Sequence, residues 1–453
     1  MKDLTKEPIL KTLLKLSIPI IIANLLQTAY QLTDFFWIGR YGTHGVAAIA
    51  LCFPIIFFFI SFGMGLSVAG SILVSQYKGN KNHEALNRVV GQSLMLIIFI
   101  SLVLSFVGYV LSNWIISLMG VEAVVASSAV SYLKISFIGN VFVFGFMTVQ
   151  GLLRGIGEVK IPMFIVLGTV LLNLIVDPLF IMGHGFIPAY GVAGAAITTI
   201  ITQSIAFVAA LIVMSGGKYD IHLKLNHMKP NKKLIKKLAM LGLPSSMEMS
   251  ARSFGMIIMT YIVASFGTVI TAAYGVGHQL FSIVLLPALG LSMATTTLVG
   301  QDMGARKIKK AQEVSNKALL IAFVTLSIMG VLAFIFAESL VRMFIPTDIE
   351  VIKEGALLIK MMAFSFGFLG AQQVFNGVFR GAGETKIPMI FTMISLWVIQ
   401  IPFAYFGSMY FGVNAIWISI PLANILVAIA ASFWFVKGKW KEKKIVHETD
   451  AYE

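Results

Sequence analysis

The sequence predicts an all-α integral membrane protein with about twelve spanning helices in two lobes of six. Three observations predict this fold class: the composition, the apolar runs that recur along the whole chain, and an internal repeat. Of the 453 residues, 58% are hydrophobic and 12% are charged, and the mean hydropathy is +0.89. Soluble proteins carry about a quarter charged residues, so lipid is expected to be the main solvent of this chain. The single cysteine, Cys52, excludes a disulfide-rich secreted scaffold.

Each expected helix is an apolar stretch of about 20 residues or more, the length that crosses the hydrocarbon core of a bilayer. In chain order the stretches cover residues 10–38, 45–76, 89–112, 125–150, 161–182, 191–214, 235–262, 270–300, 315–336, 351–379, 387–408 and 413–436. Several are longer than one crossing needs, so we expect tilt or extension beyond the bilayer. The first stretch lacks the cleavage pattern of a secretory signal and is expected to remain as the first spanning helix.

Basic residues predict which way round the chain crosses the membrane. The net charge is +14, and 28 of the 34 Lys and Arg fall in the N-terminus, the C-terminal tail and alternate loops. The other six are Arg40, Lys134, Arg252, Arg342, Lys353 and Lys360. This asymmetry is the positive-inside signal, so we expect a multi-pass plasma-membrane protein with both termini in the cytoplasm. The basic loops then set the orientation and contact anionic membrane lipid, and no nucleic-acid partner is expected.

An internal repeat divides the chain in two. The segment GLLRGIGEVKIPM at 151–163 returns as GVFRGAGETKIPM at 377–389, with nine of thirteen positions identical. We therefore expect an N-terminal six-helix lobe over 1–214, a cytoplasmic linker over 215–234, a C-terminal six-helix lobe over 235–437 and a cytoplasmic tail over 438–453. Six helices per repeat keep both lobes in the same orientation, which is the parallel-repeat plan of transporters that bind substrate between their repeats.

No motif supports ATP-driven transport or enzymatic catalysis. The paired Gly-rich segments are interpreted as charged turns between helices, since no GxxxxGK[ST] phosphate loop occurs. An intramembrane enzyme is the other class of function, but no GxSxG occurs, and His83-Glu84 lacks the second histidine of a zinc protease. We expect a protein that is no enzyme and needs no cofactor besides a coupling ion.

Two aspartates lie well inside the expected spans, where an ionisable side chain is a functional candidate by default. Asp34 shares one helical face with Gln27 and Tyr30, and Asp177 follows Asn173 by one helical turn. Both fall in the outer half of the N-terminal lobe. Because an apolar bundle disfavours joint ionisation of two carboxylates, they must hold a proton, bind a cation, or alternate between the two.

The repeat strengthens this interpretation of the aspartates. Asp34 aligns with Met259 and Asp177 with Phe403, so the C-terminal lobe has neither acid. The structural alternative is that each aspartate caps a backbone group, such as the carbonyl freed by Pro178.

The other charges within spans have simpler explanations. Lys134 aligns with Lys360, where no such acids exist, so we favour snorkelling to the outer headgroups over neutralisation of an aspartate. Glu248 and Arg252 stand four residues apart and are expected to pair with each other.

Several segments together resemble the multidrug and toxic compound extrusion (MATE) family over essentially the whole chain. They are Pro19 in the first helix, LTDFFWIGRYG, NLIVDPLF, GVAGAAITT and the twin RGxGExK turns. The resemblance implies a V-shaped pair of lobes around a central cleft. It also implies export of cationic or amphipathic drugs in exchange for inward flow of protons or sodium ions.

The acids of the N-terminal lobe are similar to those of the family's DinF-like branch, where aspartates of the first and fifth helices form the proton or cation site. The resemblance thus assigns coupling, and sodium binding if sodium is the ion, to Asp34, Asp177, Asn173 and Thr199, with Thr198 as the alternative threonine. The substrate residues that it implies are Gln27, Tyr30, Tyr132, Asn140 and Gln150, and the hinge that it implies is Pro19. The NorM-like branch differs, since its C-terminal lobe carries acids.

We therefore expect a monomeric secondary multidrug exporter that confers drug resistance by antiport of small cationic or amphipathic molecules. Proton and sodium coupling both stay open, because the four coupling residues offer enough oxygen atoms for sodium and the same carboxylates can carry protons. The alternative, from the same superfamily, is a flippase for lipids or lipid-linked saccharides, although such proteins typically have more than twelve helices.

Overall fold

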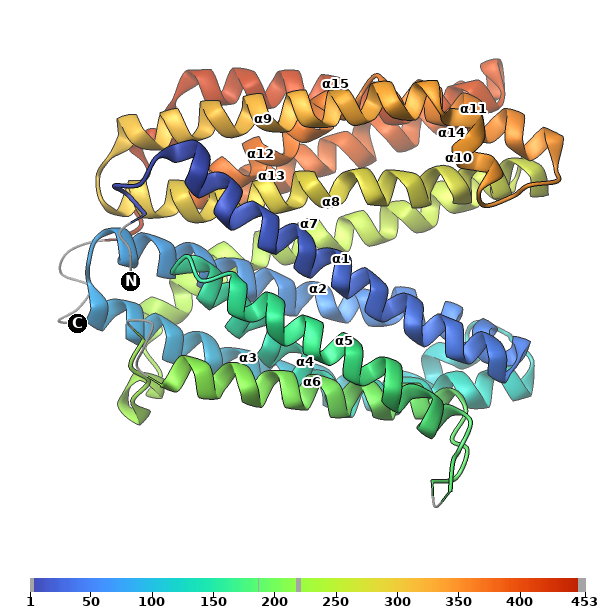
Figure 1. Cartoon of the computed structure of the whole chain (residues 1–453), viewed down its shortest axis with the longest axis horizontal. Helices are drawn as coiled ribbons and strands as arrows, with labels where there is room; N and C mark the ends of the chain where they lie inside the picture. The colour runs from blue at the N-terminus through green and yellow to red at the C-terminus, as the bar shows by residue number, and fades with distance from the viewer. Residues whose placement is uncertain (1–3, 186, 217–220, 447–453) are drawn as a thin grey trace. The chain divides into compact units, whose positions relative to one another are not determined.

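The computed structural model describes residues 4–185, 187–216 and 221–446, and helices account for most of them. The first repeat forms α1 (Ile9–Tyr41), α2 (Thr43–Gly79), α3 (His83–Ser117), α4 (Ala123–Gly155), α5 (Lys160–Ile181) and α6 (Val192–Ser215). After the short helix η1 (Leu225–Met228), the second repeat forms α7 (Lys232–Ala264), α8 (Thr268–Gly304), α9 (Ile308–Ile335), α10 (Ala337–Arg342), α11 (Ile349–Ala363), α12 (Phe366–Ala382), α13 (Lys386–Met393), η2 (Ile394–Gln400), α14 (Ile401–Phe411), α15 (Val413–Lys437) and η3 (Lys439–Glu442). Figure 1 shows them in chain order from blue to red. Over this described part the chain forms no strand.

Most of these helices are long and apolar enough to cross a membrane. Among the described residues ten stretches qualify, with α13 to α14 taken as one, and α11 with α12 makes an eleventh if this bent pair is a single span. The remaining helix of the expected twelve is α7, which has 33 residues. Its length suffices for a crossing, but Glu248, Arg252 and the serines around them lower its hydropathy.

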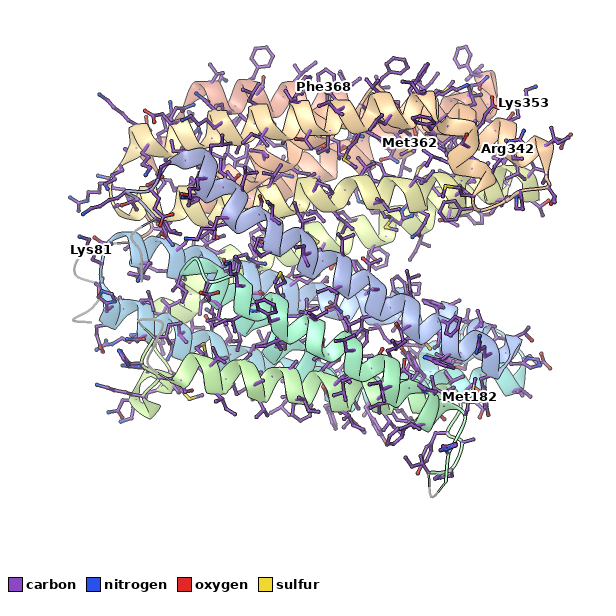
Figure 2. The ribbon with its side chains drawn as sticks, viewed as in Figure 1. Lys81, Met182, Arg342, Lys353, Met362 and Phe368 are labelled. Atoms are coloured by element: carbon purple, nitrogen blue, oxygen red, sulfur yellow. The ribbon has the colours of Figure 1, made fainter. Side chains whose placement is uncertain are left out.

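Large apolar side chains stand exposed on the outer faces of the helices. Phe106, Ile335 and Val436 are 71%, 63% and 78% exposed. Such faces suit a lipid environment, which removes the cost that water would impose on them. Figure 2 shows the charged ends: Arg342 and Lys353, two of the six basic residues assigned to the outer side, lie at the same end of the second-repeat helices.

Two expected helices depart from regular geometry. The stretch 351–379 is not one helix, because α11 and α12 meet at a 53° bend, where Ser365 Oγ donates to the Met362 carbonyl at 2.8 Å. The stretch 387–408 contains the π-helical segment η2. Pro402, the second residue after this segment, has no N–H for the helical ladder, which accounts for a wider turn at this position.

Within each repeat the same contact holds the two central helices together. Ser67 Oγ on α2 donates to the Met147 carbonyl on α4 at 2.7 Å, and Ser292 Oγ on α8 donates to the Gln373 carbonyl on α12 at 2.5 Å. A Cβ at Gly151 would fall 2.7 Å from the Ser67 carbonyl oxygen. The hydroxyls can reach because small residues let the backbones approach this closely.

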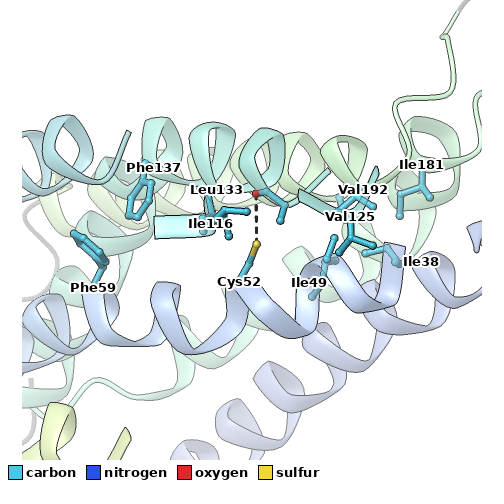
Figure 3. Close-up of a cluster of buried hydrophobic side chains, with 13 residues drawn as sticks. Ile38, Ile49, Cys52, Phe59, Ile116, Val125, Leu133, Phe137, Ile181 and Val192 are labelled. Carbon is cyan, nitrogen blue, oxygen red and sulfur yellow. Dashed lines mark hydrogen bonds between the residues drawn. The ribbon is translucent and has the colours of Figure 1, made fainter. Parts of the chain in front are cut away.

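An apolar cluster lies towards the end of the first-repeat helices where α1 ends and α2 begins (Figure 3). It includes Ile38 of α1, Cys52 and Phe59 of α2, Phe137 of α4 and Ile181 of α5. Cys52 Sγ donates to the Ala129 carbonyl at 3.4 Å, and the Phe59 and Phe137 rings meet edge to face at 4.7 Å. This packing fixes the frame from which α1, α4 and α5 present their polar residues.

By packing, the described chain forms two compact units, and these do not coincide with the two repeats. The first unit is Ile22–Met249, and the second combines the residues up to Ile21 with those from Ser250 onward. Each unit thus contains half a helix of the other repeat: the beginning of α1 packs in the second unit, and the beginning of α7 packs in the first. The expected lobe boundaries, 1–214 and 235–437, describe the sequence repeat and stay a prediction.

The connection between the repeats is attached to the first unit. Gln92 of α3 donates from Nε2 to the carbonyls of His227 and Lys229 at 2.8 and 2.6 Å, and its Oε1 accepts from the Asn231 N–H at 2.9 Å. Parts of the expected linker and tail, residues 217–220 and 447–453, lie outside the described residues.

Candidate functional site

A buried polar cluster forms where α5 meets α6, inside the first unit. Asp177 Oδ1 accepts a hydrogen bond from Asn173 Nδ2 at 2.7 Å and another from Thr198 Oγ1 at 2.5 Å. All three side chains are 0% exposed. Asn173 lies one turn before Asp177 on α5, and Gly194 lets the start of α6 approach the α5 backbone at Phe180, where a Cβ would collide.

Asp34 of α1 completes this cluster. Its carboxyl lies within electrostatic and hydrogen-bonding reach of Asp177 and Asn173. Even so, three buried oxygen atoms have no hydrogen-bond donor among the described residues: Asp34 Oδ1, Asp177 Oδ2 and Asn173 Oδ1. Buried oxygen atoms are almost always paired in folded proteins, since an unpaired one loses its hydration without compensation. The cluster therefore has acceptors in excess.

An excess of oxygen acceptors limits what the cluster can bind. A proton on one carboxyl would supply a missing donor, and a hard monovalent cation would use carboxylate, amide and hydroxyl oxygens as ligands. Over the described residues no group of three or more His, Cys, Asp and Glu side chains converges, so a transition-metal site of that type finds no support. These oxygen atoms suit a proton or a sodium ion, the two coupling ions that the sequence left open.

Tyr30 ties α1 to the same part of α6. Its hydroxyl is hydrogen-bonded to Thr202 Oγ1 at 2.7 Å, and the Tyr30 side chain is 4% exposed. Thr202 in turn donates to the Thr198 carbonyl at 2.9 Å. In the sequence, the position of Thr202 one helical turn after Thr198 is the one signal that points to it.

The two adjacent threonines of α6 occupy different places. Thr198 was the alternative to Thr199 in the sequence analysis, and it is Thr198 that donates a hydrogen bond to the Asp177 carboxylate. Thr199 is half-buried and lies within reach of the Tyr30 hydroxyl. A role for Thr199 as an ion ligand stays a prediction.

The expected substrate residues do not all lie at this cluster. Tyr132 of α4 is close enough to Asp34 for their electrostatic interaction to matter. Asn140 and Gln150 are 8 and 18 residues further along α4, hence about 12 and 27 Å from Tyr132 by the helical rise. Gln27 is exposed on α1. These residues form a row along the helices rather than one pocket, and their role stays a prediction.

The remaining expected residues lie elsewhere. Pro19 is buried in the second unit, where α1 continues through it as one unbroken helix (Figure 1). Lys134 Nζ lies 5.4 Å from the ring centroid of Tyr109 on α3. Arg252 Nη2 donates to Thr392 Oγ1 at 3.3 Å, so Arg252 has a structural partner in the second unit.

Comparison with known proteins identifies the family. The MatE family model matches residues 19–179 and again residues 244–406, once in each repeat. The chain belongs to the MATE family of transporters. The two matches begin at Pro19 and Pro244, the same position of the repeat.

Relatives and solved structures support the same assignment for this MATE protein. It is 29% identical to the probable multidrug resistance protein YpnP of Bacillus subtilis, over 98% of this chain and 99% of the relative. It is 28% identical to a probable multidrug resistance protein NorM of Thermotoga maritima, over 96% and 94% of the two chains. A crystal structure of a MATE protein in complex with MaL6 superposes with a TM-score of 0.91 at 23% identity, covering 97% of this chain and 98% of that one.

These findings establish three of the expectations. The fold is that of solved MATE transporters, the protein is a multi-pass membrane protein, and its family is one of multidrug efflux transporters. Within this MATE protein Asp34 and Asp177 lie in the first repeat, whereas the aligned residues of the second are Met259 and Phe403.

Proposed function

We propose that this MATE protein is a secondary antiporter that exports cationic or amphipathic compounds in exchange for protons or sodium ions taken up at Asp34 and Asp177. One observation carries the proposal: the excess of buried oxygen acceptors on Asp34, Asp177 and Asn173. If Asp34 and Asp177 only capped backbone N–H groups, each of their oxygen atoms would have a hydrogen-bond donor. Names such as multidrug resistance protein among the relatives support the substrate class.

The ion reaches the aspartates from the end of the membrane where α1 ends and α6 begins. Asp34 lies seven residues before the end of α1 and Asp177 four before the end of α5, or about 10 and 6 Å along the helix axes. The positive-inside prediction places this end outside the cell. The ion removes negative charge from an apolar environment, so the loaded cluster packs differently from the empty one.

α1 is the element that transmits this change. It carries Asp34 and Tyr30 in the first unit, and its beginning, with Pro19, packs in the second unit. A shift at Asp34 alters the contact between Tyr30 and Thr202, which holds α1 against α6. Because Pro19 leaves one helical hydrogen bond unmade, we expect α1 to bend there, which reduces the room for substrate and favours its release.

The membrane potential is an adequate driving force for export of a neutral amphipathic compound in exchange for one cation. One cation that moves down a membrane potential of about 100 mV supplies about 2.3 kcal/mol. That free energy supports about a fortyfold gradient of a neutral solute.

Reconstituted vesicles with separately imposed pH and sodium gradients test the proposal. We expect Asp34→Asn and Asp177→Asn each to abolish gradient-driven efflux of a cationic dye, because neither amide can alternate between charged and neutral forms. Asp348→Asn is the matched control. Asp348 is exposed at the N-terminus of α11 and accepts from the Glu350 and Val351 N–H groups, a capping role that asparagine performs equally well.

Undiminished efflux in both aspartate variants would contradict coupling at this cluster. A protein that scrambles lipid in the same vesicles while exporting no dye would favour the flippase alternative. The gradient that drives efflux identifies the ion.

A further inference from the structure

A polar cavity of about 440 Å³ lies inside the first unit, between the start of α3, the short helix η1 and the start of α7. Eight of its ten lining residues are charged or polar. The charged ones are Arg88, Lys224 and Lys229, which are positive, and Glu84, which is negative. The cavity thus has an excess of positive charge, and the antiport proposed above makes no use of it.

The wall that the linker contributes to this cavity is held tightly against α3. Besides the three bonds from Gln92, a Cβ at Gly91 would fall 2.6 Å from the His227 carbonyl oxygen, so the two backbones touch. The His227 side chain is buried, and its Nδ1 accepts from the Lys224 N–H at 3.3 Å. The proton of the neutral ring is therefore on Nε2, which lies 3.5 Å from Glu84 Oε1. The cavity is formed before any ligand enters it.

Only part of the positive charge is paired inside the protein. Arg88 Nε donates to Glu84 Oε1 at 3.2 Å, so the carboxylate has donors on two sides. Among the described residues no acceptor meets the two Nη groups of Arg88 or the Nζ atoms of Lys224 and Lys229. The cavity therefore offers several cationic donors to an anion.

The cavity lies at the level where lipid headgroups are expected. Gln92 falls near the start of the expected span 89–112, and Arg88 and Glu84 lie one and five residues before that span, or about 1.5 and 7.5 Å along the helix axis. The positive-inside prediction places this end of α3 at the cytoplasmic surface. Anionic phospholipid headgroups and soluble phosphate compounds both reach this surface.

The charge pair on α3 is not part of the plan that the two repeats share. A shift of 225 residues converts Glu84 into Lys309 and Arg88 into Glu313. Both charges are reversed in sign, so the pair is a feature of the first repeat alone. A role in the common fold would not explain it.

We propose that this cavity binds a phosphate group, with Arg88, Lys224 and Lys229 as its cationic ligands. The Nη groups of one guanidinium are two donors in a fixed fork, which matches two oxygen atoms of a phosphate. The two lysines add charge from the opposite, linker side of the cavity, and Glu84 opposes binding. The phosphate belongs either to the headgroup of an anionic phospholipid or to a soluble compound.

Two substitutions that break the same ion pair separate phosphate binding from a structural role. Arg88→Gln removes a ligand of the phosphate, whereas Glu84→Gln removes the charge that repels it. We expect Arg88→Gln to weaken phosphate binding and Glu84→Gln to strengthen it, each about fivefold. A merely structural pair would make the two variants change in the same direction. Lys309→Gln is the matched control, because it also removes one positive charge but lies on α9, outside the cavity.

Protection of Lys224 from trypsin measures binding, because a phosphate on Lys224 Nζ withholds this side chain from the protease. Cleavage after Lys224 is followed in detergent with inorganic phosphate, against chloride at equal ionic strength, and in nanodiscs of phosphatidylcholine with and without phosphatidylglycerol. Cleavage after Lys443, an exposed lysine outside the cavity, is the internal control. Calorimetric titration with inorganic phosphate, and with short-chain phosphatidylglycerol, gives a second measure that needs no cleavage.

The two probes distinguish the two sources of the phosphate. Binding of inorganic phosphate would identify a soluble compound, and binding of phosphatidylglycerol alone would identify a lipid headgroup. Binding of neither probe would overturn the inference. So would a change in the same direction in Arg88→Gln and Glu84→Gln, or a loss in Lys309→Gln equal to that in Arg88→Gln. None of these measurements involves efflux, so they judge the cavity independently of the proposed function.

Discussion

Thr198 is the residue that can separate a coupling role of Asp177 from a packing role. Its hydroxyl donates to the Asp177 carboxylate, whereas Thr199, the next residue, lies towards Tyr30. A hydrogen bond to a charged group contributes about 1.5–3 kcal/mol. Thr198 therefore sets how readily Asp177 stays charged and how readily it takes up an ion.

We expect Thr198→Val, which removes this donor at nearly constant volume, to slow efflux about tenfold or more. Thr199→Val should stay close to the parent, and Thr198→Ser should recover most of the rate. Efflux rates and the ion concentration for half-maximal efflux measure the effect. Equal losses in the two valine variants would show that Thr198 has no special relation to the carboxylate.

At this scale the sequence singled out Asp34, Asp177 and Asn173, which lie together, but did not show which hydroxyl groups join them. These three residues stand out because charged and amide groups are rare in spanning helices and because the second repeat lacks them at the aligned positions. Adjacent threonines point about 100° apart on a helix, so a motif spacing could not decide between Thr198 and Thr199. Thr202 contacts Tyr30, 172 residues away, and no local pattern encodes such a contact.

α5 and its counterpart in the second repeat, α13 to α14, occupy the same place in the repeat but differ in residues and in helix geometry. α5 carries the buried amide and acid at Asn173 and Asp177, and the aligned positions, Ile399 and Phe403, lie in and just after the π-helical segment η2. η2 contains no buried residue. The apolar pattern predicted a regular helix here, since periodicity reports burial and not the number of residues per turn.

The segment that joins the repeats is a second element with a defined role. The side chain of Gln92 makes three hydrogen bonds to the backbone of residues 227–231. Loss of these bonds would leave buried backbone groups unpaired, at about 1–3 kcal/mol for each.

We expect Gln92→Leu to release this segment and to make trypsin cleave after Lys224 much faster. Gln312→Leu is the control, because Gln312 makes one exposed hydrogen bond, to Asn316. Digestion of the purified proteins followed by mass spectrometry gives the cleavage sites and rates. Unchanged cleavage in Gln92→Leu would mean that other contacts hold the segment.

For the whole molecule, the orientation in the membrane rests on the distribution of basic residues. Lys309 at the start of α9 belongs to the majority expected in the cytoplasm, and Lys353 of α11 belongs to the six expected outside. Both side chains are exposed and helical. The positive-inside rule predicts opposite accessibility for the two.

In a Cys52→Ala background, a membrane-impermeant maleimide should label Lys353→Cys in intact cells. Lys309→Cys should react only after the cells are opened. Labelling of Lys309→Cys in intact cells would reverse the assigned direction of transport.

At this scale the repeat was visible in the sequence, and the exchange of half-helices was not. Identical residues at a spacing of 225 show that two segments have the same plan, but they carry no information on which segment each one packs against. Gly65 and Gly290 stand 225 residues apart, at equivalent positions of the repeat; their contacts with α7 and α1 depend on packing across distant parts of the chain.

The exchange has a consequence for the ancestry of the molecule. A chain of six helices that swapped the beginning of its first helix with a second copy would have made both glycine contacts as a homodimer. Duplication and fusion of its gene would then have kept the swap inside one chain, with the linker over residues 215–234 as the segment that joined the two copies. Two separately made halves, cut after Ser215, would each be an incomplete fold and should become stable only when they are produced together.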